Sequence, residues 1–434
     1  MNIAVVGLGH IGLPLAAQYA SKGHRVIGCD INPAVVEMVN AGRAYDDEPG
    51  LQERVAEAVK AGLLTAQTST TEGVEQAEIV VVIVPLMVDE DKAIAYHAMD
   101  AATRDVAAGL KPGTLVVYET TLPVGDTRNR FGPMLEDGSG LKAGQDFSLA
   151  FSPERVYVGR VFEDLRKYPK IVGGIDPQST KKAVAFYEAV LDADVTEVEN
   201  AETAEFTKLA ETTYRDVNIA LANEFAAFAE AQGIDVLQAI DAANSQPFSH
   251  IHRPGVGVGG HCIPVYPYFY ANRTDNAARI ARLSREVNDG MASHVVSRLE
   301  AALDGLAGKT VVVFGWAYRE NVKEDAFTVA KRLVRELREA GAAVLVHDPH
   351  YTADELKSRG LMPYEPGSDT RVDAVILQAV HQAYREYDWS SIPGLSVLVD
   401  GRNQLTPEER PEGICFIGVG RSSDLSIAPA GRVP

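Results

Sequence analysis

"GLGHIG", residues 7–12, follows the short apolar run NIAVV at residues 2–6 and precedes PLAAQYASKG at residues 14–23, which has a helical composition. A second apolar run, HRVIGCD at residues 24–30, ends in Asp30, eighteen residues after the last glycine of the motif. A G-x-G-x-x-G motif between a strand and a helix, followed by an acidic residue, is typical of a dinucleotide-binding turn. The motif alone also fits a purely structural turn, but this context predicts a Rossmann-type βαβ unit.

The glycine turn has a direct chemical use. Its glycines let the backbone approach a pyrophosphate, which would lie at the N-terminus of the next helix, where free N–H groups and the helix dipole favour an anion. Asp30 can accept hydrogen bonds from the 2′ and 3′ hydroxyls of a ribose and would repel a 2′-phosphate. We therefore expect NAD rather than NADP. The cofactor contacts expected in this unit are Gly7, Gly9, His10, Ile11, Gly12 and Asp30.

The rest of the chain alternates between two patterns. Residues 200–244 carry no strand signal, and their apolar residues recur at helical spacing in one long, Ala-rich helix that ends at Gly233. Strands and helices alternate on both sides, which predicts parallel sheets. We expect the α/β class, with two doubly wound Rossmann-like domains joined by a long central helix. The expected strands outside the first unit are 77–84, 113–120, 147–153, 309–318, 342–349, 372–380 and 396–400, and Asn32 is the expected N-cap of a second helix.

Composition narrows the possible partners and compartment. The net charge of −19 argues against nucleic acid as a partner. No run of 18 apolar residues is present to span a membrane, and the N-terminus lacks the basic region of a signal peptide. The three cysteines are widely spaced, so they predict neither disulfides nor a metal site and favour the cytoplasm. The tail, residues 421–434, is expected to be disordered.

One cysteine stands apart from the others. Cys262 follows a glycine-rich loop in GVGVGGHCIPVYPYF, residues 255–269. A thiol beside such a loop could act as a nucleophile, or it could be a small buried apolar side chain, which is the commoner role of a free cysteine. The loop itself does not decide between the two.

Several segments together resemble the UDP-glucose/GDP-mannose dehydrogenase family. They run through nearly the whole chain in that family's order, and RDVNIALANE and GVGGHCI look most like its N-acetylhexosamine branch. The segments are GLGHIGLPLA, DINP, EPGL, TTLPVG, SPERV, AEFTKLAETTYRDVNIALANE, GVGVGGHCIPVYPYF and DGRN.

The resemblance implies an NAD-dependent enzyme of the cytoplasm that oxidises the 6-hydroxyl of a nucleotide sugar twice, to a carboxylate. It implies a domain that binds NAD at residues 1–199, a central helical domain for dimerisation and the active site at 200–304, and a domain that binds the UDP part of the substrate at 305–434. Chemistry is expected between the outer domains, in a homodimer.

The resemblance also implies roles for four residues. Cys262 would form a thiohemiacetal and then a thioester, and Lys208 would stabilise the alkoxide. Glu154 would assist the water that hydrolyses the thioester, and Thr121 would hold that water or the cofactor. Thr121 and Glu154 are also expected cofactor contacts. From the residues alone, Lys208 could be a surface lysine, Glu154 a helix-start carboxylate in a structural pair, and Thr121 a β-branched residue at a strand end. The expected substrate contacts are Arg155, Lys208, Arg215, Gly257, Gly260 and Tyr266.

The chain departs from the family's pattern at four places. Thr212 stands where an asparagine is usual, Tyr266 replaces an aspartate that would orient Lys208, Ala326 replaces an arginine, and VPLM at residues 84–87 lacks a hydroxyl of VPTP. These changes leave open a single two-electron oxidation, to an aldehyde or a ring ketone. A non-catalytic protein that binds NAD is a third possibility, but it would be expected to lose Cys262.

Overall fold

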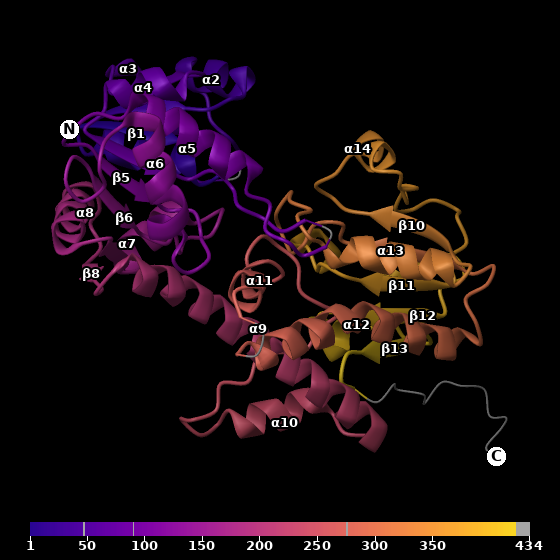
Figure 1. Cartoon of the computed structure of the whole chain (residues 1–434). Helices are drawn as coiled ribbons and strands as arrows, with labels where there is room; N and C mark the ends of the chain where they lie inside the picture. Colours follow the sequence, from indigo (N-terminus) through magenta and orange to yellow (C-terminus); the bar gives the residue numbers. More distant parts are fainter. Residues whose placement is uncertain (47, 90, 275–276, 422–434) are drawn as a thin grey trace. The chain divides into compact units, whose positions relative to one another are not determined.

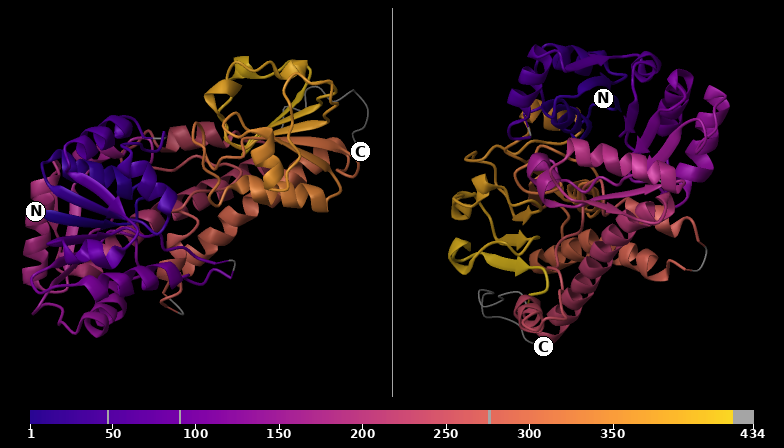
Figure 2. Two further views of the ribbon diagram at one scale, coloured as in Figure 1. Left: turned by 90° about the horizontal axis from the view of Figure 1, so that it is seen from above. Right: turned by 90° about the vertical axis from the view of Figure 1, so that its left-hand side faces the viewer.

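The chain forms two compact units. In the computed structural model, which describes residues 1–46, 48–89, 91–274 and 277–421, unit 1 comprises residues 1–211 and 268–275, and unit 2 comprises residues 212–267 and 276–434. The long helix α9 (Ala201–Gln232) is one continuous helix that begins in unit 1 and continues in unit 2 (Figure 2). The predicted end of this helix at Gly233 is confirmed.

Unit 1 contains an eight-stranded sheet with the order β3-β2-β1-β4-β5-β6-β7-β8. Figure 1 labels its strands β1, β5, β6 and β8. Its first six strands follow the order of dinucleotide-binding sheets, which places the point of reversal between β1 and β4. The strands are β1 (Asn2–Val6), β2 (Arg25–Cys29), β3 (Leu64–Gln67), β4 (Ile79–Val82), β5 (Leu115–Tyr118), β6 (Ser148–Phe151), β7 (Lys170–Gly174) and β8 (Val195–Glu197).

Helices cover both faces of this sheet, as the doubly wound prediction requires. Apolar side chains of α1, α3, α7 and α8 form one buried cluster with alternate residues of the strands, and α5 packs beside both α4 and α6. The helices are α1 (Gly12–Ser21), α2 (Pro33–Asn40), α3 (Leu51–Lys60), α4 (Thr70–Glu75), α5 (His97–Gly109), α6 (Gly132–Ser139), α7 (Val161–Lys167) and α8 (Pro177–Val190), with a π-helical turn at Thr127–Phe131. The side chain of Asn32 caps α2, as predicted, by accepting from the N–H of Ala34.

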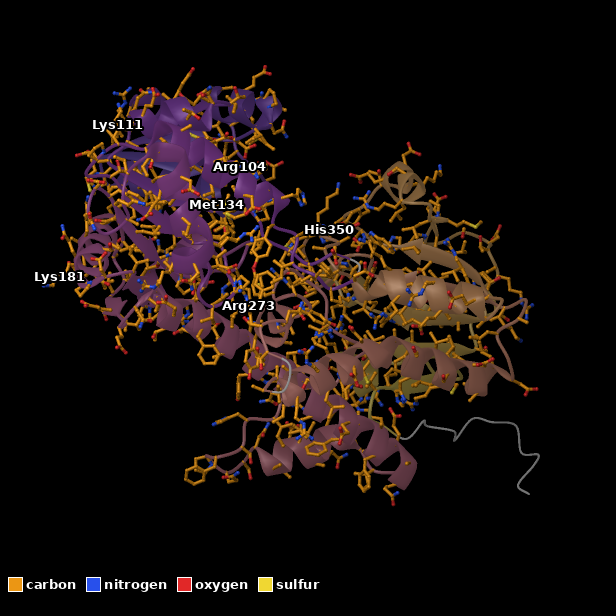
Figure 3. All side chains as sticks on the ribbon, in the orientation of Figure 1. Arg104, Lys111, Met134, Lys181, Arg273 and His350 are labelled. Atoms are coloured by element: carbon orange, nitrogen blue, oxygen red, sulfur yellow. The ribbon has the colours of Figure 1, made fainter. Side chains whose placement is uncertain are left out.

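A short segment from later in the chain also belongs to unit 1. Residues 268–275 follow the start of α11 (Tyr266–Ala271). The guanidinium of Arg273, labelled in Figure 3, pairs with the Asp126 carboxylate and donates to the Tyr96 hydroxyl. The side-chain amide of Asn272 donates to the carbonyl oxygen of Lys92. These polar contacts attach the segment to the loops that follow β4 and β5.

Unit 2 contains a parallel sheet of five strands with the order β10-β9-β11-β12-β13. Helices α12 and α13 pack against each other and contribute to one apolar cluster on the sheet (Figure 1). Short 3₁₀ turns at 382–384 and 389–391 contribute Tyr384 and Trp389 to the cluster on the other face. The elements are α10 (Val236–Ala243), α12 (Arg279–Leu303), β9 (Thr310–Phe314), α13 (Val329–Glu339), β10 (Ala343–His347), α14 (Ala353–Ser358), β11 (Ala374–Leu377), β12 (Val397–Asp400) and β13 (Cys415–Gly418).

The predicted fold class is confirmed, with differences of detail. Strands β3, β7, β8 and β13 were not among those expected. The strands β6 and β7 pair antiparallel, so the first sheet is not wholly parallel. The second sheet carries 3₁₀ turns rather than full helices on one face. Residues 422–434, most of the tail expected to be disordered, lie outside the described residues.

Candidate active site

The glycine turn in unit 1 has the geometry that a dinucleotide needs. A Cβ on Gly12 would lie 1.9 Å from the carbonyl oxygen of Gly7, so only glycine lets α1 begin this close to the end of β1. A Cβ on Gly9 would meet nothing within 4 Å, which leaves that side of the turn open. No side chain caps the first turn of α1. Its N–H groups therefore suit the pyrophosphate of NAD.

Asp30 lies directly after β2, beside this turn. One of its carboxylate oxygens accepts from the N–H of Leu8 at 2.9 Å, and the other accepts from the N–H of Asn32 at 2.9 Å. An ionised carboxylate offers about four acceptor positions, so both oxygens can also accept from ribose hydroxyls. The two bonds fix the carboxylate where the sequence predicted a ribose contact.

The remaining two residues predicted in the turn differ in their surroundings. The ring of His10 is exposed, with its centroid 4.7 Å from the centroid of the Tyr45 ring. The hydroxyl of Tyr45 donates to the carbonyl oxygen of Leu8 at 2.9 Å. Ile11 packs against the apolar cluster of unit 1. The His10 ring is thus on the exposed side of the turn, and Ile11 joins the turn to the apolar cluster.

Replacing Asp30 by alanine is expected to reduce the preference for NAD over NADP. The variant loses the ribose contact and also the repulsion of a 2′-phosphate, so kcat/KM should fall with NAD and rise with NADP. Lost hydrogen bonds to a charged group cost about 1.5–3 kcal/mol, or roughly 10- to 150-fold with NAD. Steady-state kinetics with both cofactors measure the ratio. Comparable kcat/KM values for NAD and NADP in the unmodified enzyme would refute the role of Asp30.

Thr121 lies in the loop after β5, which a buried glutamate holds in place. Thr121 is only 4% exposed. The carboxylate of Glu205 accepts from the N–H groups of Gly125 and Thr127 at 2.5 and 2.9 Å. Burial raises the pKa of Glu205 to about 7. Sequence reasoning missed Glu205, although its place three residues before Lys208 on a predicted helix gave a signal.

Glu154 lies in the loop after β6 and takes part in a buried ion pair. Its carboxylate accepts from the ammonium of Lys170 at 2.8 Å and from the N–H of Arg155 at 2.7 Å. The Lys170 ammonium also reaches Glu119 at 3.0 Å. The alternative from the sequence was that Glu154 is a helix-start carboxylate in a structural pair. The ion pair is present, but Glu154 does not start a helix, because α7 begins only at Val161. Sequence reasoning missed Lys170 and Glu119, whose charges adjoin the apolar runs IVGG and LVVY.

The other predicted residues of unit 1 are Arg155 and Lys208. The guanidinium of Arg155 donates to the Glu211 carboxylate at 2.9 Å and to the carbonyl oxygen of Pro169 at 3.2 Å. Lys208, on α9, is only 5% exposed. A solvated surface lysine would be more exposed than this, so its burial does not fit that alternative.

In unit 2, a partly buried arginine fixes the glycine-rich loop before Cys262. The guanidinium of Arg402 donates to the carbonyl oxygens of Gly257 at 2.7 Å and Gln378 at 2.6 Å. Its burial lowers the pKa of Arg402 to about 10. The side chain of Asn223 adds a bond to the N–H of Gly255 at 2.9 Å. The loop is therefore attached to the carboxyl ends of β11 and β12 and to α9.

The loop packs closely against residues 318–327 just before the cysteine. A Cβ on Gly260 would lie 2.8 Å from the ring of Tyr318, and the φ of Gly260 is +91°, so glycine is required there. The N–H of Gly260 donates to the carbonyl oxygen of Ala326 at 2.9 Å. Cys262 itself is partly exposed. Partial exposure at the end of a fixed loop fits the role of a nucleophile better than the role of a buried apolar side chain.

Three further predicted or divergent residues lie in unit 2. The N–H of Tyr266 donates to the carbonyl oxygen of Cys262 at 2.9 Å, so Tyr266 begins α11 one turn after the thiol. Arg215 lies on α9. Burial lowers the pKa of His252, and the positive charge of Arg215 lowers it further. The hydroxyl of Thr212 is buried and has no hydrogen-bond partner among the described residues. Cys262, Tyr266 and Arg215 thus belong to unit 2, and Thr121, Glu154 and Lys208 to unit 1.

The strand order of unit 1, its glycine turn and Asp30 define a protein that binds NAD in the manner of a dehydrogenase. Three family models match the chain: the NAD binding domain at residues 1–191, the central domain at 202–290 and the UDP binding domain at 312–407. All three describe the UDP-glucose/GDP-mannose dehydrogenase family, and the chain belongs to it. It is an NAD-dependent nucleotide-sugar dehydrogenase.

Individual relatives support this result over most of the chain. A UDP-N-acetyl-D-mannosamine dehydrogenase from Pyrococcus horikoshii is 35% identical over 433 residues, covering 97% of this chain and 99% of that protein. An NDP-N-acetyl-D-galactosaminuronic acid dehydrogenase from Ralstonia solanacearum is 36% identical over 410 residues, covering 92% and 95%. The solved structure of a UDP-D-ManNAc dehydrogenase from Pyrococcus horikoshii is 32% identical, with a TM-score of 0.88 over 97% of this chain and 99% of that one.

Proposed function

We propose that this protein oxidises the C6 hydroxyl of a UDP-N-acetylhexosamine to a carboxylate, with two molecules of NAD and one of water per product. The observation that carries the proposal is the fixed, partly exposed Cys262, since a second oxidation at one carbon benefits from a nucleophile. The printed names of the relatives from Pyrococcus and Ralstonia favour an N-acetylated sugar, and the match to a UDP binding domain favours UDP.

The first oxidation removes a hydride and a proton from the C6 alcohol and leaves an aldehyde. When bound, NAD accepts the hydride in each of the two oxidations. In this reaction Lys208 stabilises the alkoxide with its ammonium, because a positive charge in a water-poor site is most effective where negative charge develops. Thr121, buried in the loop after β5, orients the reacting groups with its hydroxyl.

Cys262 makes the second oxidation possible. Its sulfur adds to the aldehyde carbon and gives a thiohemiacetal, whose carbon again carries a transferable hydrogen. Loss of a hydride and a proton from this adduct leaves a thioester on Cys262. Arg402 and Tyr318 keep the loop before the cysteine in one conformation, so the sulfur needs little reorganisation to attack.

Hydrolysis of the thioester completes the reaction. A water molecule adds to the acyl carbon, the C–S bond breaks, and the products are the carboxylate and the free thiol of Cys262. Glu154 receives the proton of the attacking water in this step. The proposal thus assigns the nucleophile to unit 2 and the base to unit 1.

Counting NADH against a panel of nucleotide sugars tests the proposed function. The expected result is two NADH per sugar, with a higher kcat/KM for UDP-N-acetylmannosamine or a related UDP-N-acetylhexosamine than for UDP-glucose, GDP-mannose or TDP-glucose. One NADH per sugar would refute the four-electron reaction. It would favour a single oxidation, the alternative left open because Thr212 and Tyr266 depart from the family's pattern. A preference for UDP-glucose would refute the substrate class alone.

The assembly and domain division belong to the same proposal. Leu221, Phe225 and Phe228 are exposed on α9 at helical spacing, which supports a homodimer through this helix. Sedimentation equilibrium that gave the mass of one chain would refute it.

The family matches support the division into residues 1–199, 200–304 and 305–434. None of the helices in the described part of the chain has the length and apolar content to span a bilayer. The three widely spaced cysteines support a cytoplasmic location.

A further inference from the structure

A buried chain of polar groups leads from the core of unit 1 to Glu154. The carboxylate of Glu119, which follows β5, accepts from the hydroxyls of Tyr187 at 2.5 Å and Tyr19 at 3.1 Å. Its other oxygen accepts from the ammonium of Lys170 at 3.0 Å, and the same ammonium donates to Glu154 at 2.8 Å. The exposed fraction of the side chains rises along the chain, from 0% at Glu119 through 5% at Lys170 to 11% at Glu154. Glu154 is therefore the end that a ligand can reach.

The bonds to Glu154 fix its carboxylate from two sides. One oxygen is held by the Lys170 ammonium and the other by the N–H of Arg155 at 2.7 Å. A carboxylate with about four acceptor positions then has one side left for water. The backbone N–H of Glu154 also donates to the carbonyl oxygen of Glu119 at 3.2 Å. The orientation of Glu154 is thus set by the N–H of Arg155 and by two buried residues, Lys170 on β7 and Glu119 directly after β5.

The charges in the network explain why Lys170 is needed. Two carboxylates this close and this buried cannot both stay ionised without a cation between them. Burial raises the pKa of Glu119 and is also the largest single effect on Glu154. At Glu154, however, the Lys170 charge and the hydrogen bonds to the carboxylate, including those from Lys170 and the N–H of Arg155, together outweigh burial and hold the pKa below its ordinary value. The pKa of Lys170 is itself raised, because the two carboxylates outweigh the opposing effect of burial.

The other charged and titratable groups around Glu154 already have partners of their own. The guanidinium of Arg155 pairs with Glu211 on α9. Asp164 and Tyr168 line the same small pocket as Glu154 and Lys170, and both bond to the guanidinium of Arg160. The Lys170 ammonium also lies 4.9 Å from the centroid of the Tyr187 ring, which favours a cation. Lys170 is therefore the cation that bonds directly to the Glu154 side chain.

We propose that Lys170, anchored by Glu119, is the positioning residue that orients the Glu154 carboxylate and keeps it ionised for the attack of water on the thioester. This inference rests on the role of Glu154 in the proposed function. A buried ion pair by itself contributes little to stability compared with apolar packing. The direction of the network, from fully buried tyrosines to a partly exposed carboxylate, indicates a role at the exposed end.

The double variant Glu119→Gln/Lys170→Met tests the inference without leaving the fully buried Glu119 carboxylate unpaired. Without the cation, the pKa of Glu154 should rise, so the carboxylate is protonated at a higher pH. The acid limb of the kcat profile is expected to move up by about 1 to 3 pH units, the effect of an adjacent opposite charge. The KM for the nucleotide sugar should stay within about twofold. Lys170→Arg should restore the original limb, and Lys167→Met, which removes an exposed lysine just before β7, should leave it in place.

A titration without substrate separates this inference from the proposed function. Difference infrared spectra against the Glu154→Gln variant report the ionisation of the Glu154 carboxylate in each background. The midpoint is expected to rise in the double variant and to return in Lys170→Arg. An unchanged midpoint in a double variant that keeps its circular dichroism spectrum and Tm would overturn the inference. Failure of the proposed function would instead appear as a Glu154→Gln enzyme with normal turnover, whatever the titration shows.

Discussion

Replacing Cys262 by alanine is expected to abolish formation of the carboxylate while the first oxidation continues. An aldehyde without a sulfur adduct is a poor hydride donor, so the second oxidation should fall on the order of 10³-fold or more, equivalent to about 4 kcal/mol. Cys262→Ser should behave similarly, because an alkoxide is scarce at neutral pH compared with a thiolate. Product analysis by mass spectrometry should then show at most one oxidation equivalent per sugar.

A second cysteine of unit 2 provides the matched control. Cys415 begins β13 and is partly buried against the apolar cluster of that unit, so Cys415→Ala should leave the NADH count unchanged. Loss of activity in both variants, together with a lowered Tm, would indicate damage to the fold rather than to the chemistry. A Cys262→Ala enzyme that still converted its substrate fully to the acid would rule out the covalent mechanism.

The features that the sequence predicted well are those with local causes. The glycine turn at 7–12, the cap at Asn32 and the helix of 32 residues at 201–232 each depend on neighbouring residues. Steric limits around Gly12 and the side-chain bond from Asn32 operate over a few positions, so a motif captures them. The cofactor could be predicted for the same reason, since Asp30 follows the turn at a fixed spacing.

The features that the sequence did not predict depend on contacts between distant segments. Lys170 and Glu119 are 51 residues apart, and Arg402 and Gly257 are 145 residues apart. The contacts of Lys170 with Glu119 and Glu154 depend on the antiparallel pairing of β7 with β6. No local pattern of apolar residues predicts this reversal of strand direction. A charged residue beside an apolar run is a signal of a buried pair, but its partner becomes visible only in the folded chain.

The divergent positions differ in how the structure accounts for them. The carbonyl oxygen of Ala326 holds the N–H of Gly260, a backbone contact that any residue could make, so the loop before Cys262 keeps its support without an arginine side chain. Thr212 has a buried hydroxyl with no partner among the described residues, which nothing in the structure explains. Tyr266 begins α11 through its backbone, and that contact would be the same with an aspartate.

Replacing Glu154 by glutamine is expected to stop the reaction after the thioester has formed. The amide keeps the size of the carboxylate, and its oxygen can still accept a hydrogen bond from Lys170, but it cannot take the proton of the attacking water. Loss of a general base slows such a step about 10²- to 10⁴-fold. Because both oxidations precede hydrolysis, a burst of two NADH per enzyme should be followed by a slow steady rate.

The stalled enzyme can be identified directly. After mixing with substrate and NAD, intact-protein mass spectrometry should show Glu154→Gln carrying the mass of the acyl sugar nucleotide, and the same variant with Cys262→Ala should carry none. The adduct should disappear on treatment with hydroxylamine, which cleaves thioesters. Absence of an adduct, with unchanged turnover, would reduce Glu154 to its structural ion pair. An adduct that accumulates in Glu119→Gln/Lys170→Met at low pH but not at high pH would connect the two residues, because protonation of Glu154 removes the same base that the amide replaces.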